Sequence, residues 1–282
     1  ARRPYLSEWE QAHQGHWDAA VKGNSALRSA LVGTLFDELA YYEGETSTTI
    51  LWDMEKFYDN IDIVKLVDLA IKLEYPTRLL ALGLVMHMAP RTIRANCTYD
   101  VAGLPDNGII AGCSQSNAFA RAYLHDLLQY VTNRPPAPGE HRLFRQFVDD
   151  IRQSHRGKTD TAVNTIRIAN VLASGLTGVG CRISSKATIL SNKLSVAQHI
   201  AKSLSLRSIR NKIAKVAKDL GVDCTAGARR STPQQRQRMS KARARVKRIR
   251  TLSKVFKGAS KLYNSGAQPQ ATYGAVAWGY TP

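Results

Sequence analysis

The chain has 282 residues, of which 44% are hydrophobic, and its 40 Lys and Arg outnumber 22 Asp and Glu to give a formal net charge of +18. This length and apolar content are typical of a folded core and exclude a disordered chain. No apolar run is long enough to cross a membrane and the first residues lack a signal-peptide core, so we expect a soluble, intracellular protein without a membrane partner.

The first half of the chain predicts helices around one buried strand. Leucines spaced four apart, from Leu27 to Leu39, predict an amphipathic helix over 24–43. The β-branched and apolar residues of 47–53 predict a buried strand. The other elements expected here are helices over 62–74, just after Pro76 and over 114–131, and a strand or hairpin over 91–101.

The second half predicts strands that alternate with helices. After a loop at 134–139, two short strands are expected to meet at Asp149 and Asp150. A helix at about 160–175, strand-like residues 181–191, two short strands around Leu220-Gly221 and a long helix from Thr232-Pro233 follow. These elements indicate an α+β fold, with helices behind a small antiparallel sheet.

The positive charge is concentrated in one part of the chain. Between Lys202 and Lys261 there are nineteen Lys and Arg but only two acids, Asp219 and Asp223, whereas the remainder is nearly neutral. Such a concentration is typical of a surface that binds phosphates, although a solvated helix face or a localisation signal has the same composition. The cysteines, Cys97, Cys113, Cys181 and Cys224, lie far apart without a CxxC pair and indicate neither zinc nor disulfides.

Three segments together carry a candidate chemistry. Asp53 ends the strand at 47–53 and begins DMEKFYDNID, the pair Asp149-Asp150 ends FVDD, and the glycine-rich residues 108–113 lead into a helix. Two carboxylates on neighbouring strands can hold the pair of hard cations that phosphoryl transfer uses. Each segment alone is weak evidence for catalysis. An Asp-Asp pair can arise by chance, Asp53 could be a helix cap, and the glycines could form a simple turn.

In this order the segments resemble the reverse transcriptase family, over most of the chain from about residue 25. DMEKFYDNID is similar to the first palm motif of retroelement and group II intron enzymes. The resemblance implies that Asp53 and Asp149 bind two Mg²⁺, with Mn²⁺ as a substitute, and that Asp150 assists them. Tyr58 falls where the family places an aromatic that blocks the ribose 2′-hydroxyl, which would select deoxynucleotides.

The glycine-rich segment resembles the second motif of the family less closely. Gly112 and Ser116 fit its pattern, and the resemblance implies that they contact substrate. However, Ala111 stands where a glutamine is usual and Asn117 where a proline is usual. Our hypothesis is that Gln115, one turn further on, substitutes for the missing glutamine.

Downstream residues resemble the rest of the polymerase domain. Lys186 corresponds to a lysine that would stabilise the leaving pyrophosphate. KDLGVDCTAG at 218–227 resembles the turn that grips the primer, and the basic helix after it resembles a thumb that follows a duplex by its phosphates. The residues expected to bind nucleic acid are Arg229, Arg230, Arg236, Lys241, Arg243 and Lys247.

The resemblance thus implies a polymerase right hand, with partial fingers over 1–47, a palm over 48–200, and a thumb and C-terminal connection over 201–282. Its partners would be an RNA or RNA/DNA template-primer and deoxynucleoside triphosphates. The family's basic finger residues lie before its first palm motif, and few are present here. The chain is therefore expected to be part of a retroelement polyprotein, and the basic run at 241–250 resembles a nuclear localisation signal.

Three alternatives stay open. An RNA-dependent RNA polymerase shares the palm, but it usually has glycine where Val148 stands, and it accepts the ribose hydroxyl that Tyr58 would exclude. A palm without catalysis can persist as a scaffold that binds nucleic acid, which Ala111 and the sparse fingers favour. A plain basic nucleic-acid-binding protein explains the charge but leaves the three ordered segments unexplained.

Overall fold

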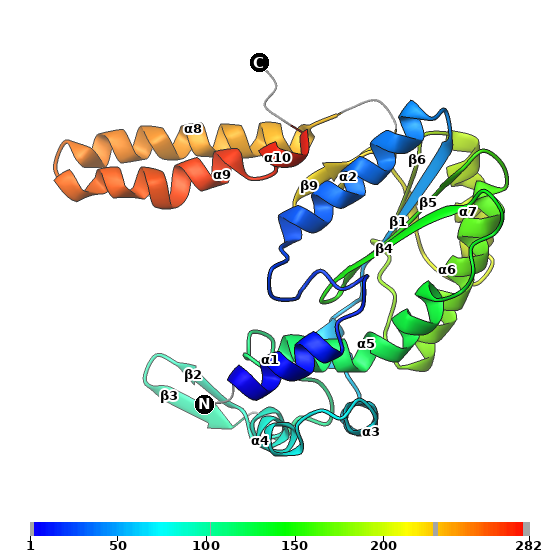
Figure 1. The fold of residues 1–282 in the computed structure, drawn as a ribbon. Helices are drawn as coiled ribbons and strands as arrows, with labels where there is room; N and C mark the ends of the chain where they lie inside the picture. Colours follow the sequence, from blue (N-terminus) through cyan, green and yellow to red (C-terminus); the bar gives the residue numbers. More distant parts are fainter. Residues whose placement is uncertain (1–2, 102, 228–230, 279–282) are drawn as a thin grey trace.

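The computed structural model describes residues 3–101, 103–227 and 231–278, and it confirms an α+β fold with a five-stranded sheet at its centre (Figure 1). The strand order is β4 (His141–Phe147), β5 (Asp150–Gly157), β1 (Thr46–Trp52), β6 (Thr188–Ser191) and β7 (Lys212–Ile213). Neighbouring strands run antiparallel except β6 and β7, which pair in parallel. The sheet is therefore mixed, which corrects the expectation of a purely antiparallel one.

Helices cover both faces of this sheet. Helix α2 (Ala26–Tyr42) contacts β1, β4 and β5 on one face, whereas α6 (Thr161–Gly178) and α7 (Leu194–Ser205) lie on the other (Figure 1). Six of the seven residues of β1 are buried, because the central strand is covered from both sides. Its buried hydroxyls are paired, with Thr48 Oγ1 2.7 Å from Thr165 Oγ1 and Thr49 Oγ1 2.8 Å from Ser154 Oγ.

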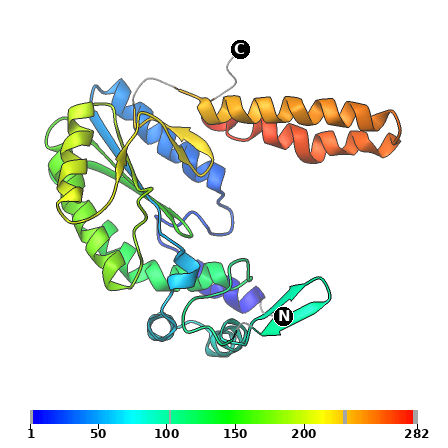
Figure 2. The same cartoon turned by 180° about the vertical axis from the view of Figure 1, so that it is seen from behind.

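A second group of helices lies below one end of the sheet. It contains α1 (Arg3–Ala12), α3 (Ile63–Lys72), α4 (Thr77–His87), α5 (Ser116–Thr132) and the hairpin of β2 (Thr92–Ala95) and β3 (Thr98–Val101) (Figure 2). The carboxylate of Asp62 caps α3 by accepting hydrogen bonds from the N–H groups of Val64 and Lys65. Helix α5 carries eleven buried residues, among them Phe119 and Leu128, and it therefore forms the centre of the hydrophobic core.

Helix α2 occurs where it was predicted, but its leucines do not form the buried face. Its buried residues are small or polar, such as Ala30, Gly33 and Asp37, whereas Leu35 and Leu39 are about half exposed. Small side chains allow the helix to approach the sheet closely. The spacing of apolar residues thus predicted the helix correctly and its orientation wrongly.

The C-terminal part forms a helical arm. After the hairpin of β8 (Ala217–Asp219) and β9 (Val222–Cys224), α8 (Pro233–Ser253) leads outward and the chain returns through η2 (Lys257–Ser260), η3 (Tyr263–Ala267), α9 (Gln268–Thr272) and α10 (Ala275–Trp278) (Figures 1 and 2). We call Pro233–Thr272 the α8–α9 arm. Within the described residues, no helix is long and apolar enough to span a bilayer.

The expected domain boundaries at 47 and 200 stay predictions, because no feature of the fold marks them. Strand β7 lies beyond residue 200 and still belongs to the central sheet. Helix α2 lies before residue 47 and packs on that sheet. The right-hand architecture likewise stays a prediction.

Candidate active site

Asp53 lies directly after β1, the middle strand of the sheet. The last residue pair between β1 and β5 joins Trp52 to Ile151. Because the strands are antiparallel, Asp53 and Asp150 lie at the same end of the sheet. The backbone carbonyl of Asp53 accepts a hydrogen bond from the N–H of Ser184 at 2.8 Å. Backbone pairing therefore fixes Asp53 at a strand end, where a carboxylate is held more rigidly than on a loop.

Asp149 lies in the tight turn between β4 and β5. Phe147 pairs with Asp150, so Val148 and Asp149 form a two-residue loop. Val148 has φ +61°, a left-handed conformation that is rare for a β-branched side chain. Its carbonyl accepts a hydrogen bond from Gln146 Nε2 at 2.9 Å. The turn therefore carries backbone strain, a feature that gathers at functional sites.

The three aspartates influence one another's ionisation. Burial raises the pKa of Asp149, and the negative charge of Asp53 raises it further. Burial also raises the pKa of Asp150 to about 6, and the charges of Asp149, Asp219 and Asp53 contribute in the same direction. The ionised carboxylates therefore repel one another, and a bound cation would relieve this repulsion.

The residues around this turn fit a cation that is only partly ligated by protein. Within residues 3–101, 103–227 and 231–278, no three or more His, Cys, Asp and Glu side chains gather closely enough to hold a metal by themselves. Mg²⁺ is usually held by one or two carboxylates together with water and substrate phosphates. Asp53 and Asp149 fit that partial donor set, because the charge of Asp53 raises the pKa of Asp149, as expected for two neighbouring carboxylates.

A cavity of about 620 Å³ opens beside Asp53. Three exposed cationic side chains line it together with this aspartate: Lys56, Lys186 and Arg210. Glu55, also exposed, is a second carboxylate of the lining. Three cations beside two carboxylates suit an anion that arrives with a bound metal, such as a triphosphate. The cavity thus brings Lys186, which the sequence singled out, together with Asp53.

Lys56 and Arg210 were not among the predicted site residues. Lys56 is three residues after Asp53, so its position in the first motif was a usable indication. Arg210 had no local pattern, because the parallel pairing of Thr188 with Lys212 is what brings its loop back toward Lys186. Only the tertiary structure could identify it.

Tyr58 lies within electrostatic reach of the aspartate turn. It belongs to the short helix η1 (Phe57–Asn60), and burial followed by the charge of Asp149 raises the pKa of its phenol. Its hydroxyl donates a hydrogen bond to Asn117 Oδ1 at 3.4 Å. Asn117, a departure from the family pattern, therefore contacts the residue expected to select the sugar.

The glycine-rich segment contacts the first motif through its backbone. The N–H of Gly108 donates to the carbonyl of Ile61, and the N–H of Ile109 to the carbonyl of Tyr58, both at 2.8 Å. Gly108 has φ +89°, and a Cβ atom there would lie 2.9 Å from backbone atoms of Tyr58 and Asp59. This contact therefore requires glycine.

Gln115 and Ser116 are buried near the start of α5. Gln115 is 1% exposed, and its Nε2 donates to the carbonyl of Leu79 at 3.1 Å. Ser116 is equally buried, and its Oγ donates to the carbonyl of Ile110 at 2.6 Å. Both side chains are thus hydrogen-bonded to backbone carbonyls near the start of α5, and their expected contacts with substrate stay predictions. Gly112 lies on the surface with φ +84°.

Helix α8 presents the expected basic surface. The predicted residues Arg236, Lys241, Arg243 and Lys247 are exposed, and none of them forms a salt bridge with any part of the chain that the structure describes. Arg229 and Arg230 lie outside the described residues. Arg238, the neighbouring cation, instead covers the ring of Tyr273 at 4.4 Å and donates to its carbonyl. It therefore attaches α8 to the returning chain.

The comparison of structures finds proteins whose fold is similar to that of this chain. No family model matches the sequence, and no curated protein matches it. The similar solved structures include two telomerases of Candida tropicalis. An apo telomerase truncated from its C-terminal domain superposes with a TM-score of 0.54 at 12% identity, over 79% of this chain and 42% of the telomerase chain.

The second is telomerase in complex with the TWJ fragment of telomeric RNA, with a TM-score of 0.55 at 10% identity, over 80% of this chain and 35% of that one. This chain therefore spans less than half the length of either telomerase. At such low identity the similarity concerns the fold alone, which this chain shares with part of the two telomerases.

Proposed function

We propose that this chain is the RNA-directed DNA polymerase domain of a retroelement, which adds deoxynucleotides to a primer 3′-hydroxyl on an RNA template. One observation carries the proposal. Asp53 and Asp149 come from neighbouring strand ends, their charges interact, and Asp53 lines a cavity together with Lys56, Lys186 and Arg210. A carboxylate pair beside clustered cations is what nucleotidyl transfer requires.

The roles of the residues follow from their positions. Asp53 and Asp149 would hold two Mg²⁺, which supply activation of the hydroxyl and charge neutralisation on the triphosphate. Lys56, Lys186 and Arg210 would orient the triphosphate from the other side of the cavity. The primer 3′-hydroxyl loses its proton to water, and its oxygen forms a bond to the α-phosphorus. The bond between that phosphorus and the oxygen that bridges it to the β-phosphate breaks, and pyrophosphate leaves with the electron pair.

Tyr58 and helix α8 complete the proposal. The ring of Tyr58 would lie beneath the sugar of the incoming nucleotide and exclude a 2′-hydroxyl by its volume. The exposed cations of α8 would contact the phosphates of the template-primer duplex without reading its sequence. Association with nucleic acid is also in keeping with the RNA complex of the telomerase that shares this fold.

The second candidate function is a polymerase-like scaffold that binds nucleic acid without catalysis. Two observations favour it. Ala111 stands where the second motif usually has a glutamine. Gln115, our hypothesis for its substitute, is buried and donates a hydrogen bond to the carbonyl of Leu79.

Primer extension distinguishes the two candidates. We would compare the wild-type chain, Asp149→Asn and the exposed control Asp68→Asn on an RNA template with Mg²⁺ and deoxynucleotides. The polymerase predicts extension by wild type and control and its loss in Asp149→Asn. Duplex binding by all three without extension by any would contradict the polymerase and establish the scaffold.

A further inference from the structure

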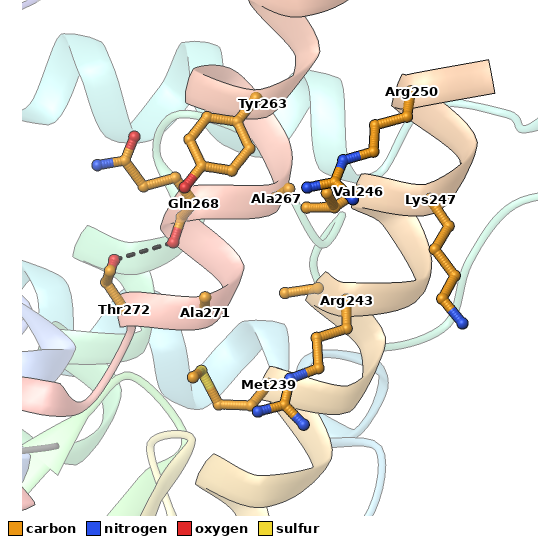
Figure 3. Close-up of a pocket in the computed structure, with 11 residues that line it drawn as sticks. Met239, Arg243, Val246, Lys247, Arg250, Tyr263, Ala267, Gln268, Ala271 and Thr272 are labelled. Carbon is orange, nitrogen blue, oxygen red and sulfur yellow. Dashed lines mark hydrogen bonds between the residues drawn. The ribbon is translucent and has the colours of Figure 1, made fainter. Parts of the chain in front are cut away.

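The α8–α9 arm contains a groove whose apolar lining has no role in the polymerase proposal, although that proposal assigns its exposed cations Arg243 and Lys247 to duplex phosphates. It lies between α8 and the returning helix η3–α9, with a cavity volume of about 380 Å³ (Figure 3). This volume is within the range of about 300 to 1,000 Å³ that is typical of small-molecule sites. Met239, Ala242, Val246, Ala267 and Ala271 give it an apolar floor.

Two arginines project over this floor. Figure 3 shows the side chain of Arg250 directed from α8 toward the facing helix and that of Arg243 running along α8 toward Met239, whereas the amine of Lys247 points away from the groove. Arg243 and Arg250 are seven residues apart on the same face of α8, about 10 Å along its axis. Tyr263, 46% exposed, lines the groove from the facing helix. The groove thus combines an aromatic ring and an apolar floor with two guanidinium groups.

The positive charge around the groove indicates an anionic ligand. No Asp or Glu occurs anywhere in the sequence from Cys224 to Pro282, and α8 alone carries eight Lys and Arg. A neutral apolar segment would leave Arg243 and Arg250 without counter-charges, and an acidic peptide would leave the apolar floor unused. A nucleotide satisfies both, because its base is flat and apolar on its faces and its phosphates are anionic.

We propose that this groove binds one unpaired nucleotide of a single-stranded nucleic acid. The base lies on the floor against Tyr263, and the two flanking phosphates contact Arg243 and Arg250. The site differs from a surface that follows duplex phosphates, because a base that is paired and stacked cannot enter the groove. The proposal needs neither metal nor catalysis and is therefore independent of the proposed polymerase activity.

The test separates base recognition from phosphate binding. Binding of a short labelled oligothymidylate and of an abasic strand of equal length and charge would be measured by fluorescence anisotropy, with EDTA and without nucleotides. We expect wild type to prefer the oligothymidylate about tenfold, since stacking of one base contributes about 1 to 3 kcal/mol. Equal affinity for the two strands would overturn the proposal.

Matched variants assign the preference to the groove. Ala271→Leu fills the floor and should abolish the preference, whereas Ala244→Leu, the same change at an exposed position of α8, should preserve it. Tyr263→Ala should reduce the preference for the oligothymidylate without filling the cavity. Arg250→Gln should weaken the binding of both strands equally. Circular dichroism would verify that each variant keeps its helices.

Two results would contradict the assignment. In the first, Ala271→Leu retains the preference, or Ala244→Leu loses it to the same extent. In the second, poly-glutamate of matched charge displaces the bound oligothymidylate as effectively as unlabelled oligothymidylate does. The groove would then recognise negative charge alone, and an acidic protein segment would be the better occupant.

Discussion

Arg152 and Asp219 form a buried ion pair, with Nη1 of the arginine 2.7 Å from Oδ2 of the aspartate. The same guanidinium donates through Nη2 to Asp37 Oδ2 at 2.7 Å and to the carbonyl of Gly33 at 3.0 Å. One arginine on β5 therefore holds α2 and the β8–β9 hairpin against the strand that carries the aspartate turn. The charge of Asp219 in turn contributes to the raised pKa of Asp150.

Removing this arginine should destabilise the fold strongly. Arg152→Met leaves Asp37 and Asp219, which are 4% and 7% exposed, as buried carboxylates without a counter-charge. Breaking a buried pair in this way costs about 3 to 5 kcal/mol. Urea unfolding should show that loss, against less than about 0.5 kcal/mol for the exposed control Arg236→Met. A loss in Arg152→Met no larger than the control's would refute the structural role.

Gly108 offers a sharper test, because Gly112 provides a matched control. Both glycines have positive φ, +89° and +84°, but a Cβ atom on Gly108 would meet the backbone at 2.9 Å and one on Gly112 would meet nothing within 4 Å. Gly112→Ala should cost about 1 to 2 kcal/mol for the left-handed conformation alone. Gly108→Ala should lower the free energy of unfolding, measured with urea, by clearly more than Gly112→Ala does. Equal losses would show that the contact with Tyr58 and Asp59 can adjust.

Much of the fold and part of the site were predictable from local sequence. Asp53 and Asp149 could be placed at strand ends because the flanking residues are β-branched or aromatic and the turn between β4 and β5 is short. The helix expected over 62–74 and the start of α8 at Pro233 also follow local rules and are confirmed. These features depend on neighbours in the chain.

Features that depend on distant segments were not predictable. The orientation of α2 is set by Arg152, whose guanidinium lies where a larger residue at Gly33 would have to be. Gln115 is directed into the core by the carbonyl of Leu79 on α4, not toward the substrate cavity. Arg210 reaches that cavity only through the parallel pairing of β6 and β7. In each case the deciding contact comes from another element.

The buried pair of Glu140 and His155 should make the protein sensitive to acid. Burial opposes ionisation of Glu140, but hydrogen bonds from His155 and from the N–H of Ala137 outweigh it and lower the pKa of Glu140 to about 2. Burial lowers the pKa of His155. Both groups bind protons more weakly in the folded state than in the unfolded state, so both stabilise the fold at neutral pH.

The direction of the pH dependence follows from these shifts. The contribution of His155 is complete above its ordinary pKa of 6.5, and that of Glu140 above 4.5; both are lost as the pH falls. The contribution of this pair to the free energy of unfolding should therefore decrease from about pH 6.5 toward pH 2, whereas the raised pKa values of Asp149 and Asp150 act in the opposite direction. Glu140→Gln should flatten the curve below pH 4.5, whereas the exposed control Glu38→Gln should leave its shape unchanged. A difference between wild type and Glu140→Gln that stays constant from pH 6.5 to pH 3 would contradict the lowered pKa of Glu140.

Binding to duplex nucleic acid should depend steeply on salt. Each phosphate that a cation of α8 neutralises adds about 0.9 to the slope of log affinity against log salt concentration. Arg243→Gln should therefore lower the magnitude of that slope by about 1, while Lys158→Gln, an exposed change between β5 and α6, should not alter it. The slope would be read from anisotropy titrations at several salt concentrations. A wild-type slope near zero would exclude α8 as a phosphate-binding surface.

Tyr58 should control the choice of sugar if the chain is a polymerase. Its ring is half-buried near Asp149, and its hydroxyl is held by Asn117. Tyr58→Val removes the ring, so the ratio of ribonucleotide to deoxynucleotide incorporation should rise by about tenfold or more. Tyr58→Phe keeps the ring volume and should keep the selectivity, because exclusion depends on shape and not on the hydroxyl. Single-nucleotide extension with each triphosphate would measure both ratios. A rise in Tyr58→Phe equal to that in Tyr58→Val would instead assign selectivity to the contact with Asn117.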